Sequence, residues 1–363
     1  MGKILYFTLV PWDWIKQRPH FLAEGLAKSH EITLVHNKPY TGFKLVRNAR
    51  PENLRIKEIY VVPFDYLSRV NACLVTAQTK KLLAETDLVW LTHPFQYAQL
   101  KGALTARHAI AYDCMDNMLE FAFVKRNPQL YARLFDLEKE LLGACDIALC
   151  SSEHLKGELL RRYDLDRELH VVNNAIFLKD LPSGGIPTPT PSSAKTISYI
   201  GTIAQWLDFD LMLESLAREA NITYHLYGPC ETAIPQHDRL KYLGRIEHER
   251  VFGIMERSDA LVMPFKLSEL VLSIDPVKLY EYAYSHKPAI AVRYQESLKF
   301  GEFVHLYGSP EEYFRLMERL VANALEPKKT AADCLRFGED NTWGKRVEQI
   351  NGILADTDHV QGA

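Results

Sequence analysis

The sequence predicts an α/β protein with two domains, each built on a parallel sheet flanked by helices. Its 363 residues exceed the usual size of one domain and suit two. Short apolar runs alternate with helical patterns, which is typical of parallel sheets with right-handed crossovers. The segment 181–194 is rich in Pro, Gly, Ser and Thr and has no periodicity, so we expect it to separate two such series.

Apolar runs of strand length occur on both sides of this segment. They are Lys3–Val10, Glu31–His36, Asp87–Leu91, Ala109–Asp113, Ile147–Ser151 and Leu169–Asn173 before it, and Thr196–Ile200, Thr223–Tyr227, Leu240–Gly244, Ala260–Pro264 and Ala289–Arg293 after it. We therefore expect two Rossmann-like domains, 1–178 and 195–340, joined by a linker, 179–194. A cleft between the two domains is the natural ligand site, because open α/β sheets bind ligands at the carboxyl ends of their strands.

The last part of the chain, 341–363, begins with a helical pattern. Trp343, Val347, Ile350 and Leu354 follow one another at spacings that place them on a single helix face. Another part of the protein must cover this apolar stripe.

Cysteine content, hydrophobicity and charge restrict the environments and ligands that suit this protein. The six cysteines include no CxxC pair, which argues against a zinc site or a disulfide framework and fits a reducing cytoplasm. No apolar stretch is long enough for a spanning helix, so any membrane contact would be peripheral. Residues 1–178 hold 23 Lys and Arg against 20 Asp and Glu, whereas the remainder holds 20 against 26. The N-terminal half is therefore the better candidate to bind a polyanionic or lipid-phosphate acceptor.

The clearest chemical pattern is the segment 275–282. Asp275 can cap a helix and Pro276 suits its first position, so we expect a helix to begin here. The free N–H groups and the dipole of such a helix favour a phosphate, and Lys278 adds a full charge. Glu281 lies on the same face and can accept hydrogen bonds from ribose hydroxyls. Two alternatives remain: an exposed Lys/Glu pair on a surface helix, and an Asp275 that itself takes up the N–H groups.

This segment carries a family resemblance. Ser258–Phe265 followed by Pro276–Pro288 resembles the nucleotide-sugar-binding segment of GT-B glycosyltransferases (glycosyltransferase family 1/4-like). It is most similar to bacterial enzymes that build exopolysaccharide, capsule or teichuronic acid chains. The resemblance implies a GT-B fold in which the last helix crosses back to the N-terminal domain. It also implies that Lys278 contacts the donor diphosphate and Glu281 the ribose.

Further donor-binding candidates follow the strands of the C-terminal domain. Gly201 ends a strand and lets a ligand approach the backbone, with Thr202 directly after it. Gly228 follows the next strand, where a structural turn is an equal possibility. By resemblance, the loop at Gly201 lies beside the diphosphate and the loop containing Arg245 and Ile246 cups the base; Arg245 could instead reach the diphosphate.

One position departs from the family pattern. Many retaining GT-B enzymes carry two glutamates eight positions apart, and here Ser273 stands eight positions before Glu281. We expect Ser273 to be among the residues that bind the donor. Retention and inversion of configuration both stay open. The N-terminal half has no DxD motif after an apolar strand, and protein groups already meet the phosphate charge, so we expect no required metal and no cofactor beyond the nucleotide-sugar co-substrate.

The N-terminal domain offers two acids at a strand end. Asp113 and Asp116 could remove a proton from an acceptor hydroxyl, provided that burial or a neighbour raises the pKa. Asp116 is the better candidate, since Asp113 has an equal chance of capping the next helix.

Acceptor-binding candidates lie in two loops of the same domain. Trp14, Arg18 and His20 follow the first strand, and a segment of this kind often occurs there in the family; aromatic faces pack on sugars and a guanidinium pairs with phosphate. His93 follows the strand 87–91. The alternatives are core anchors for the tryptophan and structural roles for the histidines.

These patterns predict a metal-independent glycosyltransferase that moves a sugar from a nucleoside-diphosphate sugar, with UDP as the expected nucleotide, to a glycan or lipid-linked glycan in surface polysaccharide synthesis. We expect it in the cytoplasm, with a possible peripheral contact at the inner membrane, and without a nucleic-acid partner. The alternatives are a sugar-nucleotide epimerase and a non-catalytic sugar-nucleotide-binding scaffold.

Overall fold

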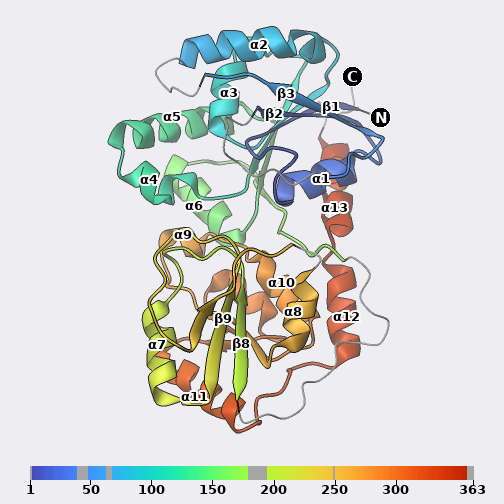
Figure 1. Cartoon of the computed structure of the whole chain (residues 1–363). Coiled ribbons are helices and arrows are strands. Elements are labelled where there is room, and N and C mark those ends of the chain that lie inside the picture. Colours follow the sequence, from blue (N-terminus) through green and yellow to red (C-terminus); the bar gives the residue numbers. More distant parts are fainter. Residues whose placement is uncertain (1, 39–47, 63–67, 179–193, 248–249, 358–363) are drawn as a thin grey trace. The chain divides into compact units, whose positions relative to one another are not determined.

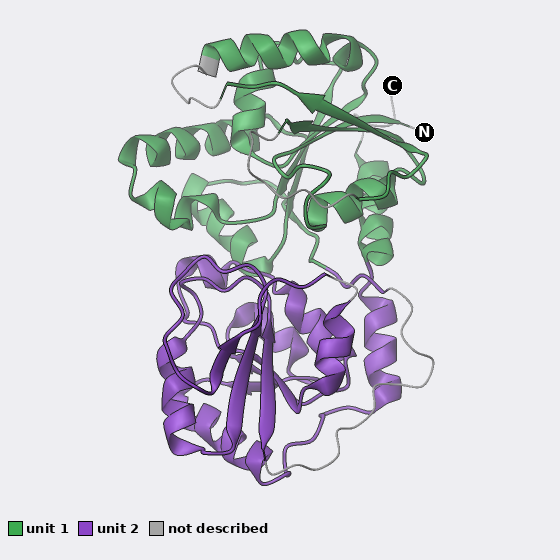
Figure 2. Cartoon of the chain, in the orientation of Figure 1, with its two compact units in different colours: residues 1–174, 343–363 green, residues 175–342 purple. Residues whose placement is uncertain are grey.

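The computed structural model describes residues 2–38, 48–62, 68–178, 194–247 and 250–357 (Figure 1). It consists of two compact units (Figure 2). Unit 1 comprises Met1–Asn174 and Trp343–Ala363, and unit 2 comprises Ala175–Thr342. The expected linker, 179–194, lies outside the described residues except for Ala194.

Unit 1 is built on a parallel sheet with the strand order β3-β2-β1-β4-β5-β6-β7. The strands are β1 (Lys3–Thr8), β2 (Glu31–Asn37), β3 (Leu54–Ile59), β4 (Leu88–Leu91), β5 (Ala109–Cys114), β6 (Ile147–Cys150) and β7 (His170–Val171). The helices are α1 (Arg18–Leu26), α2 (Ser68–Ala84), α3 (Pro94–Leu100), α4 (Ala122–Lys125), α5 (Pro128–Ala144) and α6 (Glu153–Tyr163), with a 3₁₀ turn, η2, at Met118–Glu120. The central strands β4, β5 and β6 are buried along their whole length, as expected when helices cover both faces of a parallel sheet.

Unit 2 repeats the plan with the strand order β10-β9-β8-β11-β12-β13. Its strands are β8 (Lys195–Ile200), β9 (Ile222–Tyr227), β10 (Leu240–Tyr242), β11 (Ala260–Met263), β12 (Ala289–Val292) and β13 (His305–Tyr307). Its helices are α7 (Phe209–Arg218), α8 (Val251–Arg257), α9 (Glu269–Leu272), α10 (Val277–Tyr284), α11 (Pro310–Val321) and α12 (Ala331–Asp340), with a 3₁₀ helix, η4, at Gln295–Phe300. Helices α7 and α11 lie on one side of the sheet, and α8, α10 and α12 on the other (Figure 1).

The last helix, α13 (Trp343–Asp356), belongs to unit 1 and packs on α1. All four residues of its expected apolar stripe are buried. The Trp343 ring stacks on Phe21 at 5.1 Å between centroids, and Val347 lies against Gly25 of α1, where a methyl group would meet Val347 Cγ2 at 2.4 Å. The helix thus crosses back to the N-terminal half, and the expected fold class, with two Rossmann-like units, is confirmed.

The sequence analysis did not predict two of the strands, β3 and β13. In β3 only Leu54 and Ile59 are buried, because β3 is an edge strand paired to β2 alone. In β13 only Tyr307 is buried. Neither segment forms the continuous apolar run by which the other strands were recognised. In the described part of the chain, no helix is long and apolar enough to cross a membrane.

Candidate functional site

The strand order of unit 2 reverses direction between β8 and β11. The chain runs from β8 outward through β9 and β10, then returns to continue from β11 through β12 and β13. At such a switch point the loops after two adjacent strands diverge and leave room for a ligand at their carboxyl ends. Here those loops begin at Gly201 and Pro264.

The side chain of Lys278, in the first turn of α10, lies at this switch point. Its ammonium is 4.8 Å from the centre of the Phe265 ring and 5.5 Å from that of Tyr199. A methyl group on Gly201 would lie 2.9 Å from Lys278 Cε and 3.3 Å from Nζ. Burial lowers the pKa of Lys278 to about 8, and the charge of Glu281 opposes this shift. A cation is therefore held beside a backbone that has no side chain to cover it.

Helix α10 begins at Val277, with Pro276 as its N-cap residue and no side-chain cap. This corrects the expected start, in which Asp275 capped the helix and Pro276 occupied its first position. The Asp275 carboxylate instead pairs with Lys299 Nζ at 2.5 Å and accepts a hydrogen bond from the Tyr280 hydroxyl. Since Pro276 leaves the first turn without a capping side chain, its N–H groups can meet an anion.

Glu281 and Ser273 differ in their placement. Glu281 is half-buried in α10, one turn beyond Lys278. Ser273 is buried as the C-cap residue of α9, and its hydroxyl donates to the Glu269 carbonyl at 2.9 Å. Its hydroxyl thus serves the end of a helix, as a small polar side chain commonly does.

Three loop glycines of unit 2 are in contact or joined by hydrogen bonds. Gly201 N–H donates to the Tyr227 carbonyl, and Gly228 N–H donates to the Gly244 carbonyl, each at 2.9 Å. All three glycines have positive φ, of 152°, 132° and 87° for Gly201, Gly228 and Gly244. A methyl group on Gly228 would stand 2.2 Å from the Gly201 carbonyl oxygen. Gly228 is thus required by close packing of two backbones as well as by its conformation.

The remaining donor-side candidates lie on the same loops. Thr202 is half-buried, and its carbonyl accepts a hydrogen bond from the Tyr199 hydroxyl at 2.7 Å. Arg245 is exposed and Ile246 half-buried, directly after Gly244. Unit 2 therefore brings Gly201, Gly228 and Lys278 together, with Thr202 beside them.

In unit 1, Arg18 and Asp113 bind each other. Arg18 Nη2 lies 2.8 Å from Asp113 Oδ1, its Nε lies 3.1 Å from Oδ2, and its Nη1 donates to the Val172 carbonyl at 2.6 Å. Asp113 is fully buried within β5 and Arg18 is 6 % exposed. This geometry argues against both expected roles: the carboxylate is occupied by a guanidinium, and the guanidinium is not presented to an acceptor phosphate. It also excludes the helix-capping alternative for Asp113.

Asp116 lies three residues further, in the loop after β5, and reaches the surface. Desolvation by the surrounding protein raises the pKa of Asp116; the charge of Arg18 opposes this shift, and the charge of Asp113 reinforces it. The loop is held in place because Ser151 Oγ donates to the Met115 carbonyl at 2.7 Å and Arg162 Nη2 donates to Asn117 Oδ1 at 2.9 Å. Of the two acids, Asp116 is exposed, whereas Asp113 is buried in its pair with Arg18.

Both candidate histidines, His20 and His93, form hydrogen bonds with nearby backbone. His20 is buried; its Nδ1 accepts from Gln17 N–H at 3.1 Å, so its Nε2 carries the hydrogen that faces the Pro11 carbonyl. His93 caps α3 by accepting from Phe95 N–H at 3.1 Å, and burial lowers its pKa to about 4. Both rings are held by local backbone, which favours the structural alternative over acceptor binding. Trp14 is half-buried in the loop before α1.

Sequence analysis missed the aromatic surroundings of Lys278 and the pairing of Asp275 with Lys299. Tyr199 and Phe265 lie near the ends of two segments named from the sequence, Thr196–Ile200 and Ser258–Phe265. Because a parallel sheet places such strand ends on one edge, their position could have been inferred. The Asp275–Lys299 pair joins the segment before α10 to η4, and a single sequence carries no signal for such a long-range contact.

No family model matches the chain. It is similar to a protein of Bacillus subtilis (strain 168), TuaH, that is provisionally named a teichuronic acid biosynthesis glycosyltransferase, with 24% identity over 94% of each chain. Among solved structures it is similar to sucrose-phosphate synthase from Thermosynechococcus elongatus, with a TM-score of 0.72 and 13% identity over 98% of each chain. It is also similar to HepE of Anabaena in complex with UDP and glucose, with a TM-score of 0.66 and 13% identity, over 98% of this chain and 100% of that one.

These similarities extend over nearly the full length of every chain compared, so they concern both units rather than one Rossmann-like half. They bear out the resemblance to GT-B glycosyltransferases at the level of fold.

Proposed function

We propose that this chain is a glycosyltransferase that transfers a sugar from a nucleoside-diphosphate sugar to a glycan or lipid-linked glycan. The observation that carries the proposal is the placement of Lys278. Its ammonium lies at the switch point of unit 2, against Gly201 and in the first turn of a helix without a side-chain cap. Cation, helix dipole and open backbone there favour the same ligand, a diphosphate.

The same groups suit the chemistry of transfer. When the bond between the sugar and the diphosphate breaks, negative charge grows on the departing nucleoside diphosphate. A fixed ammonium and fixed N–H groups stabilise that charge without having to reorganise. Glu281, one helical turn deeper, is suited to accept hydrogen bonds from the ribose hydroxyls. Because protein groups meet the phosphate charge, we propose that the reaction requires no metal.

We assign the proton-accepting role toward the acceptor hydroxyl to Asp116. A carboxylate with a raised pKa is a stronger base than an ordinary surface aspartate, and Asp116 reaches the surface. If Asp116 removes the proton of the acceptor hydroxyl, that oxygen can attack the donor sugar directly. Such a displacement inverts the configuration of the sugar.

We propose UDP as the nucleotide and surface polysaccharide synthesis as the setting. The support is the similarity to HepE, solved with UDP and glucose, and to TuaH, whose name places it in teichuronic acid synthesis. The reaction would then occur in the cytoplasm, with a peripheral membrane contact if the acceptor is lipid-linked.

The test is titration calorimetry of the protein with UDP, GDP, ADP and CMP. We expect UDP to bind and the Lys278→Ala variant to lose that binding. Lys80→Ala, which removes an exposed lysine of α2, is the matched control and should bind as the unaltered protein does. Failure of every nucleotide to bind would refute the proposal. Turnover of a UDP-sugar that is lost in Asp116→Asn, while UDP still binds, would separate an enzyme from a binding scaffold.

A further inference from the structure

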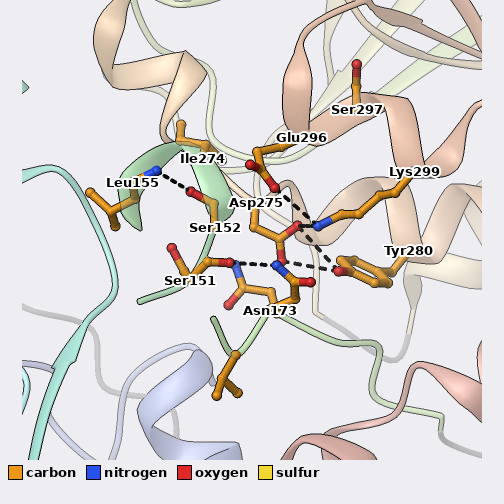
Figure 3. Close-up of polar contacts among 12 residues, drawn as sticks. Ser151, Ser152, Leu155, Asn173, Ile274, Asp275, Tyr280, Glu296, Ser297 and Lys299 are labelled. Carbon is orange, nitrogen blue, oxygen red and sulfur yellow. Dashed lines mark hydrogen bonds and ion pairs between the residues drawn. The ribbon is translucent and has the colours of Figure 1, made fainter. Parts of the chain in front are cut away.

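A buried ion pair lies directly before the helix that carries Lys278. Figure 3 shows the Asp275 carboxylate between Lys299 of η4 and Tyr280 of α10. Lys299 Nζ is 2.5 Å from Asp275 Oδ1, and the Tyr280 hydroxyl is 3.2 Å from Oδ2. The Asp275 side chain is fully buried, whereas that of Lys299 is one-third exposed. The Lys299 ammonium therefore offsets part of the cost of burying the Asp275 carboxylate.

The segment before α10 is held at a second point by the same part of unit 2. The Tyr294 hydroxyl, at the start of η4, donates to the Ile274 carbonyl at 3.1 Å. Lys299 also lies 3.5 Å from the Glu296 carboxylate and near the rings of Tyr280 and Phe300. The loop after β12 thus controls the geometry of the chain where α10 begins.

An unrestrained Asp275 could interfere with anion binding at the start of α10. Aspartate is among the best capping residues, and it stands two positions before the first residue of α10. Released from Lys299, its carboxylate could turn to the N–H groups of the first turn. Even without turning, the carboxylate would lose its cationic partner and place more negative charge beside a site for an anion.

We propose that Lys299 is a positioning residue for the donor: by holding and neutralising Asp275, it keeps the start of α10 open to the diphosphate. This inference rests on the proposed function. A purely structural role would make removal of Lys299 and removal of Asp275 weaken UDP binding equally. The positioning role predicts that only the removal of Lys299 weakens it.

The experiment compares K299M, D275N and K299R with the unaltered protein, using calorimetric UDP affinity, donor KM and kcat, and melting temperature. K299M leaves the negative charge, and we expect it to weaken UDP binding and raise donor KM by about tenfold, with kcat at saturating donor retained. D275N removes that charge, and we expect UDP affinity to be unchanged or higher. K299R should retain the affinity.

The matched control is K329M. Lys329 pairs with Glu302 at 2.8 Å in the same unit, and its side chain is as exposed as that of Lys299. Removing this pair should leave UDP affinity unchanged.

Equal UDP affinities in K299M and the unaltered protein would overturn this inference while leaving the proposed function intact. Equal weakening of UDP binding in K299M and D275N would also overturn it, because an ion pair with a purely structural role is broken equally by removing either residue. If K299M fails to fold, D275N decides: retained affinity supports the inference and weakened affinity overturns it. Absence of UDP binding in the unaltered protein would overturn the proposed function and this inference with it.

Discussion

The contact between Gly228 and Gly201 provides the sharpest test of the structure of unit 2. In Gly228→Ala, the new methyl carbon would lie 2.2 Å from the Gly201 carbonyl oxygen and 2.7 Å from its carbon. Both obstacles are backbone atoms, so no side chain can move aside. The two loops would have to separate by about 1 Å to reach normal contact.

The size of the effect follows from two costs. An overpacked contact costs about 1–3 kcal/mol, and a non-glycine residue in an unfavourable backbone region costs about 1–3 kcal/mol. We therefore expect Gly228→Ala to lower the free energy of unfolding by about 2–6 kcal/mol. Gly244→Ala is the control, because its φ of 87° is also positive while its methyl group would meet nothing within 4 Å. The free energy of unfolding of Gly244→Ala should therefore fall only by the backbone cost of about 1–3 kcal/mol.

Urea denaturation followed by circular dichroism measures both variants on the full chain. Gly228→Ala should also bind UDP more weakly, since the loop that has to move contains Gly201, which lies against Lys278. If Gly228→Ala proves no less stable than Gly244→Ala, the packing of the two glycine loops described here is wrong.

Three further predictions concern other parts of the chain. Gly25→Ala should destabilise the protein, because its methyl group would meet Val347 Cγ2 at 2.4 Å, whereas Gly157→Ala in α6 meets nothing and should stabilise it by about 0.4–1 kcal/mol; equal melting temperatures would contradict the packing of α13 on α1. UDP affinity should fall as pH rises through about 8, since Lys278 loses its proton there and only the ammonium attracts the diphosphate. Above that pH, UDP binding should take up a proton, detected as a heat that varies with the buffer, and a Lys278→Ala variant that retains any binding should lack this uptake. EDTA should leave UDP affinity and turnover unchanged, and a loss restored by a divalent cation would refute metal independence.

Much of the fold could be predicted because it depends on local patterns. The central strands of both sheets are continuous apolar runs, and α13 presents its apolar stripe at helical spacing, so local patterns identified these elements. The edge strand β3 and the short β13 have few buried residues, and no local pattern distinguishes them from loops.

For the candidate site, the residue types by themselves determined which chemistry was possible: a lysine and a glutamate one turn apart at the start of a helix, and glycines at strand ends. Only the tertiary structure decided which of these groups are available. Arg18 and Asp113 are 95 positions apart and form an ion pair in the core, while Asp275, directly before α10, pairs with Lys299. The physical reason is that local sequence governs backbone conformation, whereas the charge and reactivity of a side chain depend on partners that the fold brings from distant positions.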